Sequence, residues 1–268
     1  MVKSVPNTWD READVVIVGS GGAGLVAALA AESEAVLVLE KAASIGGTTA
    51  VSGGGLWLPN SRPVVEAAGE QPSDELHAYL RRCAGEQVAD ELIETFVELA
   101  PDIVDFIESE TALEFQFAGY PDYHTDWEEA SDEGNMIEPT LYDGTRLGEH
   151  LEDIRDDPHH TFPVPASEIY EAGGHAKFAT VADFDELDRR KEADLLATGE
   201  ALVAGLYEAC LDAGVAFETE APARELVVDD GEVVGVVADV DGETTFVRAG
   251  ATVIAAGGDG DGYSIGAG

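Results

Sequence analysis

The stretch Ala13–Lys41, ADVVIVGSGGAGLVAALAAESEAVLVLEK, decides the fold of this chain. Its short apolar run Val15–Val18 is bounded by glycine, which predicts a buried parallel strand. The following Gly24–Ala31 consists mostly of Ala, Leu and Val and predicts a helix, and Val36–Leu39 predicts a second buried strand that ends at Glu40. Together these elements form a strand-helix-strand unit.

The glycines between the first strand and the helix have the spacing G-x-G-x-x-G, at Gly19, Gly21 and Gly24. In this pattern the first glycine makes a tight turn, the second lets the backbone approach a pyrophosphate, and the third allows close helix packing. The helix N-terminus then receives the negative charge. Glycine turns also occur for packing alone, but here Glu40 ends the second strand, where a carboxylate accepts hydrogen bonds from a ribose and disfavours a 2′-phosphate. The pattern therefore predicts a dinucleotide site.

A second glycine-rich stretch, Gly46–Asn60, has the sequence GGTTAVSGGGLWLPN. A flexible linker would lack its apolar Leu56-Trp57-Leu58, and a buried strand would not tolerate so many glycines. We therefore expect something to lie close against this backbone. Trp57 and Leu58 either line an apolar pocket or anchor the loop, and the sequence does not decide between these roles.

The middle of the chain predicts helices followed by loops. Residues 73–109 carry apolar side chains at helical spacing, with Ser73 as the expected N-cap and with Pro72 and Pro101 as expected breaks, so we expect two or three helices. From Phe115 to about Arg190 prolines, glycines and isolated aromatic residues replace this pattern, which indicates long ordered loops and short strands.

Regular structure is expected again towards the C-terminus. We predict a helix over Gly199–Ala213, a strand over Ala216–Thr219, and hairpins with Asp-Gly turns at Asp230-Gly231 and Asp241-Gly242. A further buried strand is expected in Ala251–Gly258, ATVIAAGG. The sequence contains no internal repeat.

These elements predict an α/β fold with a Rossmann-like dinucleotide-binding domain of parallel sheet, helices and β-meander. We expect a single domain over residues 1–268, in which 14–60 and 199–258 form the dinucleotide-binding core. Residues 61–198 are expected to form a helical and loop-rich insertion.

The composition is strongly acidic, with 55 Asp and Glu against 14 Lys and Arg and a formal net charge of −41. The acidic residues are scattered through apolar-rich segments, which indicates an acidic surface on a folded protein rather than a disordered tail. Because salt screens such self-repulsion, we expect a halophilic setting. Nucleic acid and anionic membrane surfaces are excluded as partners, since binding phosphate needs Lys and Arg.

Other features of the sequence favour a cytoplasmic protein. No apolar run approaches the roughly 20 residues that cross a bilayer, and the first residues lack the apolar core of a signal peptide. The two cysteines, Cys83 and Cys210, are too few for a disulfide framework and are expected to be free thiols on helices. His124, His159 and His160 have no Cys or carboxylate at matching spacing, so we predict no metal site.

The stretch Glu40–Asn60, EKAASIGGTTAVSGGGLWLPN, resembles the FAD-dependent 3-ketosteroid Δ1-dehydrogenases of the fumarate reductase/succinate dehydrogenase flavoprotein superfamily. The form GGTTAxSGGGxWxPN is closer to the steroid branch than to the fumarate reductases. The resemblance continues in the YPDY segment at 120–123, in the Glu138-Pro139 pair, and in the helix that contains GEALV. It covers about residues 14–258 and is strongest over 14–60.

The resemblance implies FAD as the cofactor and assigns roles to several segments. Gly46–Thr49 would follow the cofactor, Ser52–Gly55 would lie beside the flavin, and the backbone of Ala223 would contact adenine. No histidine lies between Gly46 and Ser52, where the covalently flavinylated relatives carry one, so we expect non-covalent FAD. The implied cofactor-binding residues are Gly19, Gly21, Gly22, Ala23, Gly24, Glu40, Lys41, Gly46, Gly47, Thr48, Thr49, Ser52, Gly53, Gly54, Gly55, Ala223, Ala256 and Gly257.

The resemblance also implies a dehydrogenation beside the carbonyl of an apolar cyclic ketone such as a ketosteroid. Tyr120 or Tyr123 would assist removal of the C2 proton through a phenol with a lowered pKa, while flavin N5 takes hydride from C1. We favour Tyr123, and the alternative is that the two aromatic residues pack a loop. The sequence does not identify the electron acceptor.

The sequence departs from the family at its end, where AAGGDGDGYSIGAG follows the last expected strand. Members of the family continue into a substrate domain that supplies further tyrosines and donors to the ketone, so we expect an incomplete FAD-binding domain and a poor catalyst. A separate chain would then supply the missing half. Two alternatives remain: a fumarate reductase-like enoate reductase, and a non-catalytic FAD-binding remnant.

Overall fold

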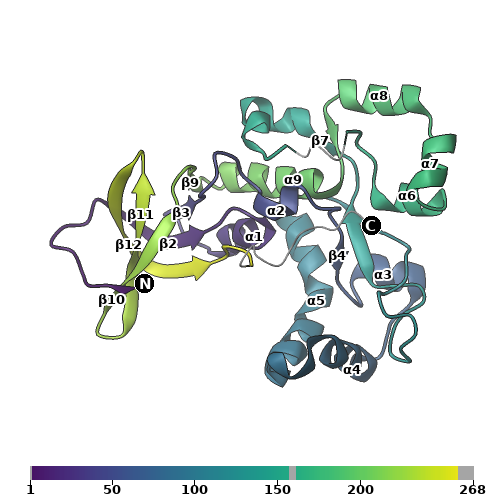
Figure 1. Ribbon diagram of the computed structural model, residues 1–268, viewed down its shortest axis with the longest axis horizontal. Coiled ribbons are helices and arrows are strands. Elements are labelled where there is room, and N and C mark those ends of the chain that lie inside the picture. Colours follow the sequence, from purple (N-terminus) through teal and green to yellow (C-terminus); the bar gives the residue numbers. More distant parts are fainter. Residues whose placement is uncertain (1, 157–160, 259–268) are drawn as a thin grey trace. The chain divides into compact units, whose positions relative to one another are not determined.

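The structure, a computed structural model, describes residues 2–156 and 161–258 (Figure 1). The chain forms two compact units, each of which is built from separate stretches of sequence. The first unit comprises Met1–Thr49, Glu152–Arg155 and Cys210–Gly268, and the second comprises Ala50–Leu151 and Asp156–Ala209.

The first unit is built on a seven-stranded sheet with the order β1-β10-β11-β12-β2-β3-β9. Strands β12, β2, β3 and β9 pair in parallel with one another. On its other edge β12 pairs antiparallel with β11, and β11 pairs antiparallel with β10, so these three strands form a meander. The strands are β1 (Val2–Lys3), β2 (Arg11–Val18), β3 (Val36–Leu39), β9 (Ala216–Glu218), β10 (Ala223–Asp229), β11 (Glu232–Val240) and β12 (Glu243–Ile254). The predicted α/β fold with a parallel sheet, helices and a meander is confirmed.

The predicted strand-helix-strand unit is present as β2, helix α1 (Gly22–Ala30) and β3. Val16 and Ile17 are fully buried, and all four residues of β3 are buried, as expected for strands at the centre of a parallel sheet. Strand β2 begins at Arg11, earlier than the predicted start at Val15. Its first residues alternate between half-buried and exposed positions, so they lack the continuous apolar run that marks the buried part.

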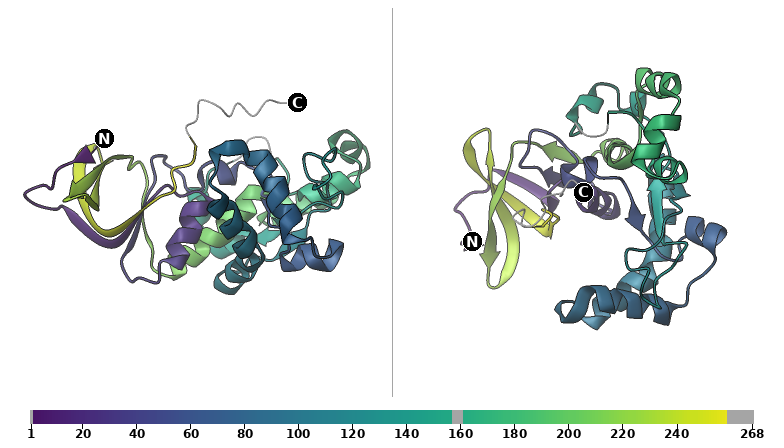
Figure 2. Two further views of the ribbon diagram at one scale, coloured as in Figure 1. Left: turned by 90° about the horizontal axis from the view of Figure 1, so that it is seen from below. Right: turned by 45° about the vertical axis from the view of Figure 1, so that its right-hand side comes forward.

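The Asp-Gly turns of the meander are confirmed at both predicted positions. Asp230, Gly231, Asp241 and Gly242 all have positive φ, which is the backbone geometry of a type I′ hairpin. Figure 2 shows the two hairpins, in yellow-green, from two further directions.

The prediction of a separate buried strand over Ala251–Gly258 is wrong in two respects. Strand β12 runs without a break from the meander into the parallel sheet, pairing with β11 through Arg248 and with β2 from Val247 onward. The strand ends at Ile254, and that side chain is 64% exposed. Because β12 changes its pairing partner without a turn, its sequence contains no turn signal that would mark where one pairing ends and the other begins.

The short helix α2 (Gly47–Ala50) lies at the end of the first stretch of the first unit. The first helices of the second unit are α3 (Arg62–Ala68), α4 (Ser73–Ala84) and α5 (Asp90–Glu110). Ser73 is the first helical residue, not the N-cap, which is Pro72. Pro101 lies inside α5 and does not end it. Residues on both sides of the proline, Ile93 and Val104, are buried, and this packing holds the helix together across the missing N–H.

The expected loop region also contains helices that the sequence did not predict. Short strands occur there as expected: β5 (Phe115–Phe117), β6 (Met136–Pro139) and β7 (Tyr142–Asp143). Two further short strands, β4 (Leu56–Trp57) and β8 (Leu195–Leu196), lie outside that region. The additional helices are the 3₁₀ segment η2 (Gly144–Asp153) and the helices α6 (Ala166–Glu171), α7 (His175–Val181) and α8 (Phe184–Glu192). A further 3₁₀ segment, η1 (Gly85–Gln87), lies between α4 and α5. These helices are too short to show a clear apolar period. Helix α8 has a side-chain cap, in which Asp183 accepts from the Glu186 N–H, whereas α6 and α7 have none.

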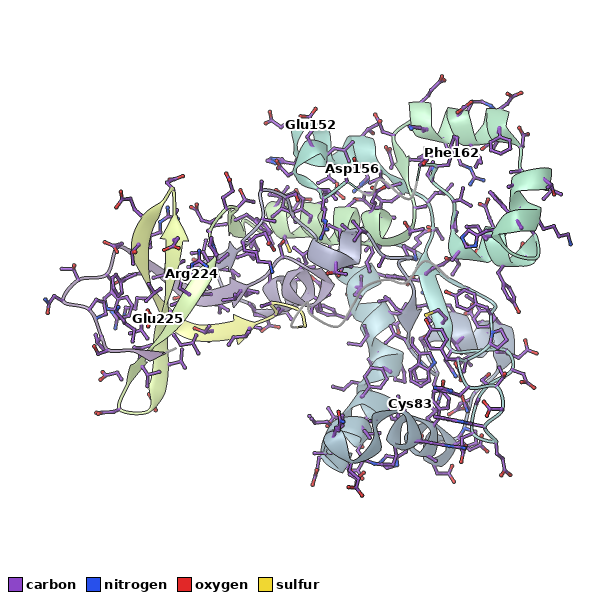
Figure 3. The ribbon with its side chains drawn as sticks, viewed as in Figure 1. Cys83, Glu152, Asp156, Phe162, Arg224 and Glu225 are labelled. Atoms are coloured by element: carbon purple, nitrogen blue, oxygen red, sulfur yellow. The ribbon has the colours of Figure 1, made fainter. Side chains whose placement is uncertain are left out.

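Helix α9 (Thr198–Asp212) agrees with its prediction to within one residue at each end. Cys83 lies exposed on α4 (Figure 3) and Cys210 lies buried on α9, and both are free thiols as predicted. None of the helices in the described ranges is long and apolar enough to cross a membrane.

Candidate functional site

The glycine turn between β2 and α1 is shaped by contacts within the protein. Gly19 has a φ of 104°, and a Cβ there would overlap the carbonyl oxygen of Ala255, just beyond β12. A Cβ on Gly24 would overlap the carbonyl oxygen of Gly19. These two glycines therefore let the turn, the helix and the end of β12 approach one another closely.

The N-terminus of α1 is suited to an anion. The N-cap residue of α1, Gly21, makes no side-chain cap hydrogen bond, the Gly22 N–H donates to Thr49 Oγ1 at 3.0 Å, and the first turn carries no acidic residue. Helix N-termini present N–H groups without intrahelical acceptors and the positive end of the helix dipole. A Cβ at Gly21 would make only an ordinary 3.5 Å contact with Thr49 Oγ1, so the absence of a side chain there leaves room in front of the helix. This geometry fits a dinucleotide pyrophosphate.

Ser20 is a buried hub that the sequence analysis did not single out. Its hydroxyl donates to Glu40 Oε2 at 2.6 Å and accepts from the Gly46 N–H at 3.1 Å, and its own N–H donates to Glu40 Oε2 at 3.0 Å. The side chain is fully buried. It therefore joins the glycine turn, the end of β3 and the second glycine-rich stretch. The one feature of the sequence that could have indicated this role is the position of a hydroxyl residue, Ser20, within the glycine turn.

Glu40 is held by the protein on most sides. It is 5% exposed, and Oε1 accepts from the Ala42 N–H at 2.9 Å in addition to the two bonds from Ser20 to Oε2. An ionised carboxylate offers about four acceptor positions, so one is left for a ribose hydroxyl. The Glu40 carbonyl accepts from the Ala221 N–H at 2.8 Å, which brings the end of β3 close to Ala223 at the start of β10.

The segment Gly46–Thr49 lies against the glycine turn. Thr49 Oγ1 accepts from the Gly22 N–H at 3.0 Å, and a Cβ on Gly47 would lie 3.8 Å from Gly21 Cα. Of the other implied residues of this unit, Ala23 lies in the first turn of α1, Lys41 is exposed after β3, Thr48 lies in α2, and Ala256 and Gly257 follow β12.

A short segment from a distant part of the sequence holds Ile45–Gly47 in place. Ile45 and Ile154 form a parallel bridge, in which the Ile45 N–H donates to the Asp153 carbonyl at 2.7 Å and the Arg155 N–H donates to the Ile45 carbonyl at 2.9 Å. Arg155 Nη1 also donates to the Gly47 carbonyl at 3.2 Å. This segment lies between Glu152 and Asp156, which Figure 3 labels.

In the second unit, protein contacts explain two glycines of Ser52–Gly55. A Cβ on Gly54, which has a φ of 71°, would overlap the backbone of Thr198, and the Ser52 carbonyl accepts from the Gly199 N–H at 3.0 Å. A Cβ on Gly55 would lie 2.9 Å from the sulfur of Met136. By contrast, a Cβ on Gly53 would meet nothing within 4 Å. The close neighbour expected for this stretch is thus the protein at Gly54 and Gly55, while Gly53 faces open space.

The two candidate tyrosines differ sharply. Tyr123 is 91% exposed. The hydroxyl of Tyr120 lies 3.3 Å from the position of a Cβ on Gly55, and its ring packs against Tyr170 with centroids 5.6 Å apart. Burial and the nearby carboxylate of Glu138 raise the pKa of Tyr120 to about 12, opposite to the lowered pKa expected for a proton-abstracting phenol. The structure therefore brings Tyr120, not Tyr123, to the Ser52–Gly55 segment.

Trp57 anchors the loop. Its ring stacks on Tyr79 and Phe96, and its Nε1 donates to Asp122 Oδ1 at 2.8 Å. Asp122 is 6% exposed, and its Oδ2 also accepts from the Ser131 N–H at 3.0 Å. These contacts support the anchoring role for Trp57, one of the two roles left open by the sequence.

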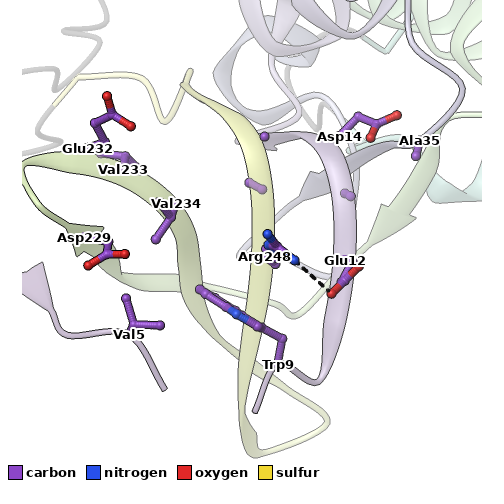
Figure 4. Close-up of a pocket in the computed structure, with 13 residues that line it drawn as sticks. Val5, Trp9, Glu12, Asp14, Ala35, Asp229, Glu232, Val233, Val234 and Arg248 are labelled. Atoms are coloured by element: carbon purple, nitrogen blue, oxygen red, sulfur yellow. Dashed lines mark ion pairs between the residues drawn. The ribbon is translucent and has the colours of Figure 1, made fainter. Parts of the chain in front are cut away.

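A cavity in the first unit lies away from the glycine turn. Its volume is about 790 Å³, and it lies over the amino-terminal half of β2, where Glu12 pairs with Arg248 at 3.6 Å beside the ring of Trp9 (Figure 4). Gly19 follows the opposite end of this strand. The cavity is therefore separate from the candidate site.

The described residues contain no cluster of three or more metal-ligating side chains. The ring of His124 stacks on Trp127, with centroids 3.9 Å apart. His159, His160 and the final segment from Asp259 lie outside the described residues.

Comparison with known proteins identifies the family. The FAD binding domain family matches residues 14–264. The chain is 35% identical over 234 residues to a 4-oxocyclohexanecarboxylate 2-dehydrogenase of Sinomonas cyclohexanicum, covering 84% of this chain and 40% of that protein. It is 30% identical over 258 residues to a 3-oxosteroid 1-dehydrogenase of Mycolicibacterium smegmatis, covering 89% and 45%. The chain thus spans less than half the length of these curated relatives.

Solved structures agree with this result. The crystal structure of 3-ketosteroid delta1-dehydrogenase from Sterolibacterium denitrificans in complex with 1,4-androstadiene-3,17-dione has a TM-score of 0.81 and 28% identity, covering 92% of this chain and 48% of that one. A flavocytochrome c3 fumarate reductase, at 18% identity and a TM-score of 0.59 over 92% of this chain and 34% of that one, shares the fold alone. The expected resemblance is confirmed: this chain belongs to the FAD-binding domain family, and its cofactor is FAD.

Proposed function

We propose that this chain is the FAD-binding part of a dehydrogenase that oxidises a CH–CH bond beside the carbonyl of an apolar cyclic ketone, as in the 3-ketosteroid Δ1-dehydrogenases. One observation carries the proposal: the Tyr120 hydroxyl lies against Gly55, in the segment that we place beside the flavin. FAD, when bound, supplies the hydride acceptor. The relatives named for ring ketones support the same class of substrate.

We place the dinucleotide on the first unit. The pyrophosphate lies at the N-terminus of α1, where Gly21 leaves room for it, and the last acceptor position of Glu40 takes one ribose hydroxyl. The backbone of Ala223 meets the adenine, and Ala256 and Gly257 lie near the pyrophosphate. All contacts in this arrangement are non-covalent, because no histidine occurs between Gly46 and Ser52.

We assign Tyr120 to the substrate in preference to Tyr123. With a pKa of about 12 its phenol keeps its proton at neutral pH. It therefore serves as a hydrogen-bond donor to the ring ketone, and a donor at that oxygen stabilises the charge that develops when the neighbouring carbon loses its proton. A group other than Tyr120 must then act as the base that removes this proton.

The setting of the protein follows from its charge. We propose a halophilic cytoplasm, because 55 acidic against 14 basic residues need screening by salt. We also propose that 14–60 and 199–258 act as one FAD-binding domain with 61–198 as its insertion, and that further sequence or a separate chain supplies the remaining donors to the ketone.

The fumarate reductase-like alternative has less support. Binding a dicarboxylate needs free cationic side chains. Arginines of the second unit are instead paired with protein carboxylates, as shown by the ion pairs of Arg62, Arg81, Arg82, Arg146, Arg189 and Arg190.

The test begins with the visible spectrum of the protein purified in molar KCl, followed by acid precipitation. Flavin bands that move into the supernatant are expected for non-covalent FAD. Turnover is then measured with a 3-ketosteroid, with 4-oxocyclohexanecarboxylate and with fumarate, using an artificial electron acceptor or donor, on this chain alone and on the chain extended by any downstream coding sequence. Turnover of fumarate without oxidation of either ketone would refute the proposed substrate class.

A further inference from the structure

The proposed cofactor site has to hold a pyrophosphate, which carries negative charge, in a chain with a net charge of −41. The dipole of α1 supplies only about half an elementary charge at its N-terminus. A fixed cation near the turn would offset the repulsion from the acidic surface. The basic residues of the first unit are Lys3, Arg11, Lys41, Arg155, Arg224 and Arg248.

Four of these side chains are paired with carboxylates on the sheet. Arg11 pairs with Glu218, Arg248 with Glu12 and Lys3 with Glu225. Arg224 of β10, labelled in Figure 3, pairs with Asp239 of β11. These pairs neutralise the charge of each cation locally. Among the described residues, no ion pair with a carboxylate is shown for Lys41 or Arg155, so these are the two cations to consider.

Arg155 is directed to the candidate site by backbone pairing. The hydrogen bonds of Ile45 with Asp153 and Arg155, at 2.7 and 2.9 Å, fix Arg155 beside the start of the second glycine-rich stretch. Its guanidinium then donates to the Gly47 carbonyl at 3.2 Å. Lys41 has no comparable contact among those that the described structure shows.

Gly47 is itself next to the turn that precedes α1. A Cβ on Gly47 would lie 3.8 Å from Gly21 Cα, and the Gly22 N–H is bonded to Thr49 in the same segment. The Arg155 guanidinium is therefore held one backbone carbonyl away from the helix N-terminus. Because guanidinium has five donors in a planar fork, one bond to a carbonyl leaves others for a phosphate oxygen.

We propose that Arg155 is a cofactor-binding residue that donates to the pyrophosphate of FAD. The inference rests on the proposed placement of the pyrophosphate at α1. It assigns a role to a residue more than 100 positions away from the glycine turn, on the segment that holds Ile45–Gly47. The G-x-G-x-x-G motif does not include Arg155, so its proposed contact with the pyrophosphate can be inferred only from the fold.

The test compares Arg155→Gln with Arg224→Gln in the full chain. Both variants remove one positive charge from the first unit, but Arg224 lies on the meander with Asp239 as its partner. Equilibrium binding of FAD is measured by quenching of flavin fluorescence in 1 M KCl. ADP is measured by competition, and riboflavin, which has no phosphate, is measured directly.

The expected result is a loss of about tenfold in affinity for FAD and ADP in Arg155→Gln, corresponding to one charge-assisted hydrogen bond partly screened by salt. Arg155→Lys keeps the charge but loses the planar fork that lets one side chain bond both the Gly47 carbonyl and a phosphate oxygen, so it should recover only part of this loss. Riboflavin affinity should not change in any variant, and Arg224→Gln should match the wild type.

Three results would overturn the inference. Equal losses in Arg155→Gln and Arg224→Gln would indicate a general effect of net charge, and a matching loss for riboflavin would indicate a disturbed segment instead of a lost phosphate contact. Unchanged binding of FAD and ADP would exclude the contact directly. A wild-type chain that binds neither FAD nor ADP would instead refute the proposed site, and the inference with it.

Discussion

Replacing Ser20 by Ala is expected to reduce the stability of the first unit substantially. The change removes the 2.6 Å bond to Glu40 and leaves the buried Gly46 N–H without its 3.1 Å acceptor. A hydrogen bond to a charged group is worth about 1.5–3 kcal/mol, and an unsatisfied buried donor costs about 1–3 kcal/mol. Because the Ser20 N–H still bonds to Glu40, we expect a net loss of about 3 kcal/mol in the free energy of unfolding.

The assay is urea unfolding followed by circular dichroism in molar KCl. Ser33→Ala is the matched control, because it also removes a serine-carboxylate hydrogen bond, of 2.9 Å to Asp14, but at an exposed position. The control should change stability by less than about 0.5 kcal/mol. If Ser20→Ala is no more destabilising than Ser33→Ala, Ser20 is not the hub of the site and the reasoning fails.

Three further predictions follow from individual contacts. Gly24→Ala should disrupt the glycine turn between β2 and α1, because the added Cβ would overlap the Gly19 carbonyl. We expect loss of FAD binding and a smaller folded fraction in size-exclusion chromatography, and a normal FAD affinity would contradict the prediction. The pKa of Tyr120 is raised from 10.0 to about 12, so the folded state holds the phenol proton more tightly than the unfolded state and the free energy of unfolding should fall between pH 10 and 12. In urea unfolding at a series of pH values, Tyr120→Phe should make this fall shallower, and an unchanged slope would refute the shift. Trp57→Phe keeps an aromatic ring but removes the 2.8 Å donor to buried Asp122, so we expect a loss of about 1.5–3 kcal/mol in thermal or urea unfolding. An equal loss on an Asp122→Ala background, which has no acceptor for Trp57, would show that the bond is not the cause.

Much of the fold could be predicted because local signals agreed with the final structure. The continuous apolar runs of β2 and β3, the glycine spacing and the Asp-Gly pairs at Asp230 and Asp241 each have one geometric solution, and the structure adopts it. The family could be predicted mainly from Glu40–Asn60, with support from the YPDY segment at 120–123 and from the helix that contains GEALV.

The failures share one cause, which is that tertiary contacts override or replace local signals. Pro101 is a helix breaker by sequence, yet packing on both sides keeps α5 continuous. The sequence favoured Tyr123 over Tyr120, and burial, which only the fold determines, separates them. Ser20 and Arg155 could not be assigned either, because their partners lie 20 to 108 positions away along the chain.

The location of β12 has a consequence for how the protein is made. Strand β2 emerges early from the ribosome, but its parallel neighbour β12 is completed only at Ile254, and the carbonyl that lies against Gly19 follows at Ala255. Residues 50–209, apart from 152–155, belong to the other unit, so that unit can form while one edge of β2 is still unpaired. Pairing across such a long separation is slow to close. An unpaired edge of this kind would attract other nascent chains, and the repulsion between highly acidic chains offers the growing polypeptide protection until the last strand arrives.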